Sequence, residues 1–252
     1  MDKVIDFLGI KVNTLTEDEM IKKILRFALM GKQKMVTYLN AHCINIALSN
    51  PEYREILNSA DIVYADGMGV VWASGFLNKP LPTRINIIDF YERFLRDSVD
   101  RNISLYFLGS KPAIVQRAVD NLKKRFPKIN ILGFHDGYFD QTEEKKIIDE
   151  ITILKPNVLL VAMGVPKQEK WVYRYRNDLM VNLYWVVGGF FDILSGFRKV
   201  PPSWVSKSGL EWFYKLLQEP RRLWRRYLIG NFVFIRHVLR WKIKKIYPFG
   251  KA

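Results

Sequence analysis

Residues 62–72 read IVYADGMGVVW, a short apolar run that passes directly into an acidic turn with two glycines. The first four residues are β-branched, aromatic or small, which is typical of a buried strand. Asp66-Gly67-Met68-Gly69 stand where a parallel strand gives way to a helix. This stretch therefore predicts one strand-to-helix unit of a parallel sheet, with a carboxylate at the end of the strand.

The same pattern recurs on both sides of this stretch. Further short β-branched or aromatic runs alternate with longer helical patterns, at residues 35–39, 103–108, 129–134, 158–163 and 183–187. Such alternation predicts an α/β fold, a Rossmann-like and mostly parallel sheet flanked by helices. Helix starts are indicated by a capping box at Thr16 and Glu19, by Asn50-Pro51, and by Thr142 ahead of a helix rich in Glu and Lys.

Small or polar residues follow five of the six predicted strands. Because the carboxyl ends of parallel strands lie along one edge of a sheet, these turns should meet where open α/β folds bind ligands. Glycines there let backbone amides and helix N-termini approach a diphosphate, although such turns also need glycine for structural reasons. The five turns are Asn40 with His42, 66–69, 109–112, 164–169 and 188–192.

Several sequence signatures are absent. There is no P-loop, no dinucleotide-binding glycine motif and no D-x-D pair. The three histidines and the single cysteine, Cys43, show no metal-ligand spacing. We therefore expect neither a metal nor a cofactor, so that cations and backbone amides would balance the charge of a bound diphosphate.

The formal net charge is +15, and most of this excess lies near the end of the chain. Residues 203–252 hold twelve Lys and Arg against two acids, Glu211 and Glu219, a net of +10 that leaves +5 for the rest. Four of the seven tryptophans also lie there, and cations among amphipathic rings favour a water–lipid boundary. We expect an α/β domain at 1–202 that holds the site, and a basic amphipathic helical C-terminal appendage at 203–252 that docks on a membrane.

Basic and apolar residues of the appendage are predicted to lie on opposite helix faces. Arginines alternate in pairs with apolar residues in 220–229, and Arg236, Arg240 and Lys244 recur every four residues in a second helix. Contact with an anionic membrane and packing on the domain's own core are the two alternatives for these faces. Nucleic acid is disfavoured because no zinc-finger or RNA-recognition signature occurs. No apolar stretch is long enough to span a bilayer, and no signal-peptide pattern opens the sequence.

Four motifs in this order resemble the WecG/TagA/CpsF family of bacterial glycosyltransferases. They are ADGMGVVW at 65–72, GVPKQEKW at 164–171, GGFFD at 188–192, and GLEW at 209–212 leading to EPRRLWRRY at 219–227. The resemblance covers nearly the whole chain. It implies an inverting, metal-independent transfer of an N-acetylmannosamine-type sugar from UDP to undecaprenyl-diphosphate-linked N-acetylglucosamine. Departures from the family pattern at Tyr38, Ile87 and Val200 leave the donor and acceptor sugars open.

The resemblance also implies a cellular setting. We expect a cytoplasmic protein, peripheral on the inner face of the bacterial cell membrane, that serves cell-surface polysaccharide or teichoic acid synthesis. A homo-oligomer is left open. The alternative from another class is a non-catalytic, membrane-associated scaffold that binds nucleotide without turnover.

An inverting transfer needs a base that takes the proton of the attacking hydroxyl, and Asp66 is the candidate, with a helix N-cap as its alternative role. Thr37 and Asn40 are candidates for hydrogen bonds to sugar hydroxyls, or for turns. Arg84 would bind sugar or phosphate, or pair with Asp89 or Glu92. Gln168 would contact the donor and Asp192 the ribose or base, whereas Glu169 would cap or charge its helix. By the resemblance, Lys215, Arg222 and Arg225 would clamp the diphosphate.

Overall fold

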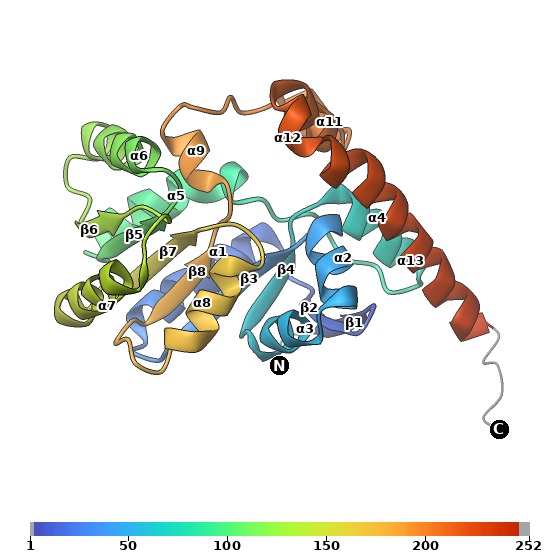
Figure 1. Ribbon diagram of the computed structural model, residues 1–252, viewed down its shortest axis with the longest axis horizontal. Coiled ribbons are helices and arrows are strands. Elements are labelled where there is room, and N and C mark those ends of the chain that lie inside the picture. Colours follow the sequence, from blue (N-terminus) through green and yellow to red (C-terminus); the bar gives the residue numbers. More distant parts are fainter. Residues whose placement is uncertain (1–2, 247–252) are drawn as a thin grey trace.

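The computed structural model describes residues 3–246, without the side chains of Ser203, Lys207, Lys245 and Ile246. Six parallel strands within this range form one sheet in the order β4-β3-β8-β7-β5-β6 (Figure 1). The predicted α/β class is therefore confirmed, and each predicted strand is present to within about two residues, as expected for boundaries of this kind. The strands are β3 (Lys34–Leu39), β4 (Ile62–Ala65), β5 (Leu105–Gly109), β6 (Ile131–His135), β7 (Val158–Ala162) and β8 (Leu183–Val186).

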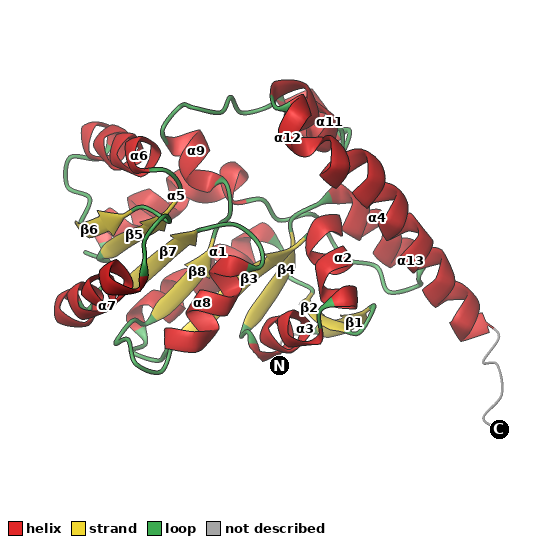
Figure 2. Ribbon diagram, in the orientation of Figure 1, coloured by secondary structure: helices red, strands yellow, loops and turns green. Residues whose placement is uncertain are grey.

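Helices cover both faces of this sheet (Figure 2). On one face, α1 contacts α5 and β8, and α6 contacts α9. On the other face, α3 contacts α2 and α8. The first layer comprises α1 (Glu17–Leu29), α5 (Ile87–Asp100), α6 (Pro112–Arg125) and α9 (Phe190–Leu194); the second comprises α2 (Ala41–Ser49), α3 (Pro51–Ser59), α7 (Gln141–Leu154) and α8 (Lys167–Tyr175).

Aromatic side chains join the sheet to the first layer. Trp185 of β8 is fully buried, stacks with Phe90 of α5 at a centroid distance of 6.0 Å, and meets Phe94 edge-on at 5.1 Å. Phe107 of β5 packs on Phe191 of α9, also at 5.1 Å. Burial of such a ring stabilises the fold by about 1.5–3 kcal/mol, so these contacts hold the strand ends in a constant position.

Two of the three predicted helix starts are confirmed. Thr16 and Glu19 form the expected capping box, and the Asn50 side chain accepts a hydrogen bond from the Tyr53 amide at 3.0 Å. The third prediction is wrong by two residues, because Asp140, not Thr142, caps α7 and forms a capping box with Glu143. An aspartate in extended backbone is as good an N-cap as threonine, and here it comes first along the chain.

A β-hairpin that the sequence analysis did not predict precedes α1. Its strands are β1 (Val4–Phe7) and β2 (Ile10–Asn13). Leu8 and Gly9 connect them with φ of 55° and 81°, the conformation that a two-residue hairpin turn requires. The Val63 amide donates to Asn13 Oδ1 at 2.9 Å, so the hairpin is held against β4 at the edge of the sheet.

The appendage forms short helices and one long helical run (Figure 1). The elements are α10 (Ser203–Lys207), α11 (Glu211–Gln218), α12 (Pro220–Trp224), the π-helical turn η1 (Arg225–Ile229) and α13 (Gly230–Ile246). The predicted second helix is therefore continuous with the first, because Arg225 and Gly230 keep right-handed helical backbone and no proline separates them. Between residues 3 and 246, no helix is both long and apolar enough to cross a membrane.

The long helix α13 has one packed face and one open face. Phe234 and Val238 belong to the same hydrophobic core as the sheet, and the Asn45 side-chain amide of α2 donates to the Gly230 carbonyl at 2.7 Å. Phe232, Ile235, Leu239 and Ile243 remain exposed. Packing on the domain's own core is thus confirmed for one face only, whereas membrane contact stays a prediction for the other.

Candidate functional site

One cavity of about 1120 Å³ lies at the carboxyl ends of the strands, under the appendage. This volume is slightly above the usual range for ligand sites, which leaves room for two substrates. All five predicted turns contribute to its lining, as expected for a parallel sheet. Representative lining residues of the turns are Asn40, Asp66, Ser110, Gly164 and Gly188, and those of the appendage include Lys215, Arg222 and Arg226.

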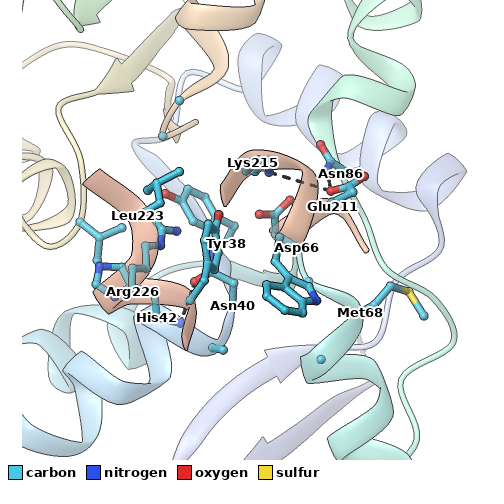
Figure 3. A pocket seen from close by; sticks show the side chains of 18 of the residues that line it. Tyr38, Asn40, His42, Asp66, Met68, Asn86, Glu211, Lys215, Leu223 and Arg226 are labelled. Atoms are coloured by element: carbon cyan, nitrogen blue, oxygen red, sulfur yellow. Dashed lines mark hydrogen bonds and ion pairs between the residues drawn. The ribbon is translucent and has the colours of Figure 1, made fainter. Parts of the chain in front are cut away.

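Asp66 follows β4, and its side chain points into the cavity toward the helix that carries Glu211 and Lys215 (Figure 3). Helix α4 (Met68–Phe76) has Gly67 as its N-cap and no side-chain cap, so the N-cap role for Asp66 is wrong. Burial raises the pKa of Asp66 to about 6, against the opposing effect of Lys215. Within the part of the chain that the structure describes, no side chain donates a hydrogen bond to this carboxylate, which leaves it free to accept one from a ligand.

Arg84 lines the cavity and is paired with two carboxylates. One is Asp89 at 2.7 Å, as the ion-pair alternative predicts, and the other is Glu211 of the appendage. Glu211 also accepts from Asn86 at 3.4 Å and lies 3.9 Å from Lys215. Burial disfavours its charge, but Lys215 and Arg84 prevail and lower the pKa of Glu211. An ionised Glu211 therefore holds the appendage against the α/β domain, beside Asp66.

A second ion cluster also joins the appendage to the α/β domain. Arg198 contacts Asp192 at 3.0 Å and Glu219 of the appendage at 2.6 Å, and Arg222 contacts the same Glu219 at 2.8 Å. Ser110 donates to Asp192 at 3.0 Å. The two acids of the basic appendage thus each bind an arginine of the α/β domain, which positions the cations of the appendage over the cavity.

The appendage directs Arg226, not Arg225, into the cavity. Arg225 is exposed, with its guanidinium 5.2 Å from the centroid of the Trp224 ring, and it does not line the cavity. Arg226 lies beside Tyr38 and His42 (Figure 3).

Arg226 differs in its partners from four other cations that line the cavity. Its Nε is buried without a hydrogen-bond partner, and among the described residues it forms no ion pair. Arg84, Arg198, Lys215 and Arg222 all have a carboxylate close by. Arg226 is therefore available to a phosphate, as are Lys111 and Lys199, which also line the cavity and form no ion pair among the described residues.

Thr37 and Gln168 lie beneath the cavity, and neither is part of its lining. Both side chains are fully buried. Gln168 donates to the Tyr38 hydroxyl at 3.2 Å, and its carbonyl oxygen accepts from the Gly164 amide at 3.2 Å. Because Tyr38 and Gly164 do line the cavity, Gln168 supports its wall, and contact with a ligand would require Gln168 or its neighbours to move.

Glu169 is the deepest ionisable group near the site. Pro166, not Glu169, is the N-cap of α8, but Glu169 does place an acidic side chain in the first turn, and this side chain is fully buried. Burial raises the pKa of Glu169 to about 7. One carboxyl oxygen accepts from Gln168 at 3.1 Å and from Thr37 at 3.4 Å, whereas the other has no partner among the described residues.

Asn40 and His42 occupy the turn after β3. The Asn40 side chain caps α2 by accepting from the amides of His42 and Cys43, both at 3.1 Å, so the turn role is confirmed, and the residue also lines the cavity. Burial, with a smaller effect of Arg226, lowers the pKa of His42 to about 4. A histidine with so low a pKa is a weak proton acceptor, which leaves Asp66 as the better base.

Trp171 and Phe191 are buried in the core, as expected. Among the polar residues that line the cavity, the sequence analysis assigned no role in the site to Glu211, Glu219, Tyr38, Arg198 and Arg226. Glu211 and Glu219 had a visible signal, since they are the only two acids in a basic segment. No such signal marked Tyr38, Arg198 and Arg226, because their presence in the lining depends on which side of each element faces the cavity.

Comparison with known proteins agrees with the motifs. A family model described as "Glycosyl transferase WecG/TagA/CpsF family" matches residues 5–247. A Bacillus spizizenii protein is 35% identical over 182 residues, which are 72% of this chain and 70% of that protein. A Staphylococcus aureus strain MW2 protein is 30% identical over 243 residues, 96% of this chain and 95% of that protein. Both relatives are named N-acetylglucosaminyldiphosphoundecaprenol N-acetyl-beta-D-mannosaminyltransferase.

Proposed function

The chain belongs to the WecG/TagA/CpsF family of glycosyltransferases, and on that premise we propose that it transfers N-acetylmannosamine from UDP to N-acetylglucosaminyl-diphospho-undecaprenol. The relatives' names supply the sugar and the acceptor. The observation that carries the proposal is a half-buried carboxylate, Asp66, in a cavity that the cations of the appendage help to line. The UDP donor, inversion and metal independence are further parts of the same proposal.

In the proposed mechanism, the acceptor hydroxyl attacks the anomeric carbon of the donor from the side opposite to UDP. Asp66 accepts the hydroxyl proton as the new glycosidic bond forms and the bond to the UDP oxygen breaks. The raised pKa makes Asp66 a stronger base than an ordinary aspartate, yet it remains mostly ionised at neutral pH. Lys215 favours this ionised form.

The leaving UDP would be stabilised by cations of the chain. Arg226, Arg222 and Lys215 all line the cavity, and guanidinium groups can donate two hydrogen bonds to phosphate oxygens. The sequence has no D-x-D pair that would hold a metal ion, which also supports stabilisation of UDP by these side chains. Charge stabilisation by fixed donors typically contributes more to such reactions than any other single effect.

The open face of α13 supports membrane docking of the appendage. Arg236 and Arg240 are exposed, next to the exposed Ile235 and Leu239. Cations near an anionic leaflet contribute about 1 kcal/mol each. We therefore propose that residues 203–252 dock the enzyme on the inner face of the cell membrane, where a lipid-linked acceptor would be located, while 1–202 carry the catalytic base.

Mass spectrometry of the reaction products tests the proposed function. UDP-N-acetylmannosamine and a lipid-diphosphate N-acetylglucosamine acceptor, incubated with the full chain in EDTA, should yield UDP and an acceptor heavier by one N-acetylhexosamine. UDP-N-acetylglucosamine serves as the donor control. Binding of the donor without release of UDP would support the scaffold instead. Loss of activity in EDTA and its return with magnesium or manganese would contradict the metal-independent mechanism.

Docking is tested by sedimentation with phosphatidylglycerol vesicles. Replacing Arg236 and Arg240 by Gln should weaken vesicle binding roughly 30-fold at low salt, since two cations contribute about 2 kcal/mol. The matched control replaces Lys123 and Lys124 of α6, which are equally charged and exposed but lie on the α/β domain. Equal losses in the two double variants would show that net charge matters and the appendage does not.

A further inference from the structure

The cavity has an apolar end that the proposed chemistry does not use. Trp72 and Phe76 of α4, and Ile235 and Leu239 of α13, line the same cavity as Asp66. These four side chains, here called the α4–α13 groove, are 46–56% exposed, so they are not part of the closed core. Exposed apolar side chains that gather at one site usually mark a binding surface.

The groove starts at the catalytic carboxylate. Helix α4 begins at Met68, two residues after Asp66, and Met68 also lines the cavity (Figure 3). The helix runs from there to Phe76, which at 1.5 Å per residue is a length of about 12 Å. At the far end, the Lys242 ammonium donates to the Phe76 carbonyl at 2.6 Å and lies 4.9 Å from the centroid of the Phe76 ring. One path therefore joins the reacting centre to the basic, exposed surface of the appendage.

Close packing holds one wall of the groove in place. Gly209, with a φ of 75°, precedes α11 and lies against Trp72. A Cβ at this position would be 2.5 Å from Cη2 of Trp72, so only glycine allows the approach. The indole is thus positioned by the connection between α10 and α11, and a ligand would meet a preformed surface.

Two neighbouring parts of the cavity match one class of ligand. Asp66 suits a sugar hydroxyl, and the α4–α13 groove, which starts beside Asp66, suits an apolar chain. A sugar linked to a polyprenyl chain carries both groups. We propose that the α4–α13 groove binds the first isoprene units of the lipid-linked acceptor, an inference that rests on the proposed function.

The inference is tested with two acceptors that differ only in their chain. N-acetylglucosaminyl diphosphate carrying a butyl group is compared with the same compound carrying a farnesyl group, without vesicles or detergent and below the concentration at which either aggregates. The readout is the ratio of kcat/KM for farnesyl over butyl. Replacement of Ile235 by Ser should lower this ratio about fivefold, because Ile235 is about half exposed and covering the exposed part is worth about 1 kcal/mol.

A matched control lies on the same helix. Ile243 is 53% exposed and Ile235 52%, but only Ile235 lines the cavity, so Ile243→Ser should leave the ratio unchanged. Leu239→Ser is the second groove variant, and circular dichroism identifies any variant that fails to fold. An unchanged ratio in both groove variants, or an equal fall with Ile243→Ser, would overturn the inference and leave the proposed function standing. No transfer by the wild-type chain to either acceptor would overturn both.

Discussion

Asp66→Asn should lower kcat for sugar transfer by at least about 100-fold, while donor binding and folding are preserved. The amide keeps the size and most hydrogen-bonding capacity of the carboxyl, but it cannot take the proton of the acceptor hydroxyl. The measurement is UDP release at saturating donor and acceptor. Asp120→Asn, the same change on the exposed surface of α6, is the control and should leave kcat unchanged.

The pH dependence provides a second test of Asp66. Burial raises its pKa to about 6, so the carboxyl is increasingly protonated, and unable to act as a base, as the pH falls through 6. Below that value kcat/KM should fall about tenfold per pH unit, and above it the rate should level off. The residual activity of Asp66→Asn should lack this acidic limb. A limb that persists in the variant would assign the titration to another group and contradict the role of Asp66.

Arg226→Ala should lower kcat about 100-fold or more on a water-soluble acceptor, whereas Arg225→Ala should change it little. A fall in kcat of this size is expected when an enzyme loses a donor that stabilises charge in the transition state. The two arginines are neighbours in η1, but only Arg226 lines the cavity, and its Nε is buried without a partner. Because the acceptor is soluble, loss of membrane docking cannot cause the difference.

Arg226→Lys refines this comparison. Lysine keeps the charge but cannot donate bidentate hydrogen bonds to a phosphate, so the kcat of Arg226→Lys should lie between those of the wild type and Arg226→Ala. Similar effects of the Arg225 and Arg226 substitutions would contradict the orientation of η1. A loss confined to KM would show that Arg226 binds donor equally in the ground and transition states.

The hydrophobic periodicity of the sequence was sufficient to predict the sheet, the parallel direction of its strands and the edge at which the turns meet. These features are local: an apolar run of four to six residues with a glycine turn has few alternatives to a buried strand. The sequence analysis missed the hairpin at β1 and β2, whose strands lie outside the repeated strand-and-helix pattern of the six-stranded sheet. Its position depends on the hydrogen bond between Asn13 and Val63, which are 50 residues apart.

For the site, the sequence was sufficient to place Asp66 at the cavity, because it follows its strand directly, and to reveal a cationic appendage from composition alone. Only the tertiary structure decided that Arg226 lines the cavity and Arg225 does not, that Gln168 lies below the cavity, and that Glu211 and Arg84 meet. The physical reason is that residue type and local periodicity set an element's shape, whereas the direction of each side chain depends on how distant elements pack. Arg84 and Glu211 are 127 residues apart, and no local pattern encodes their contact.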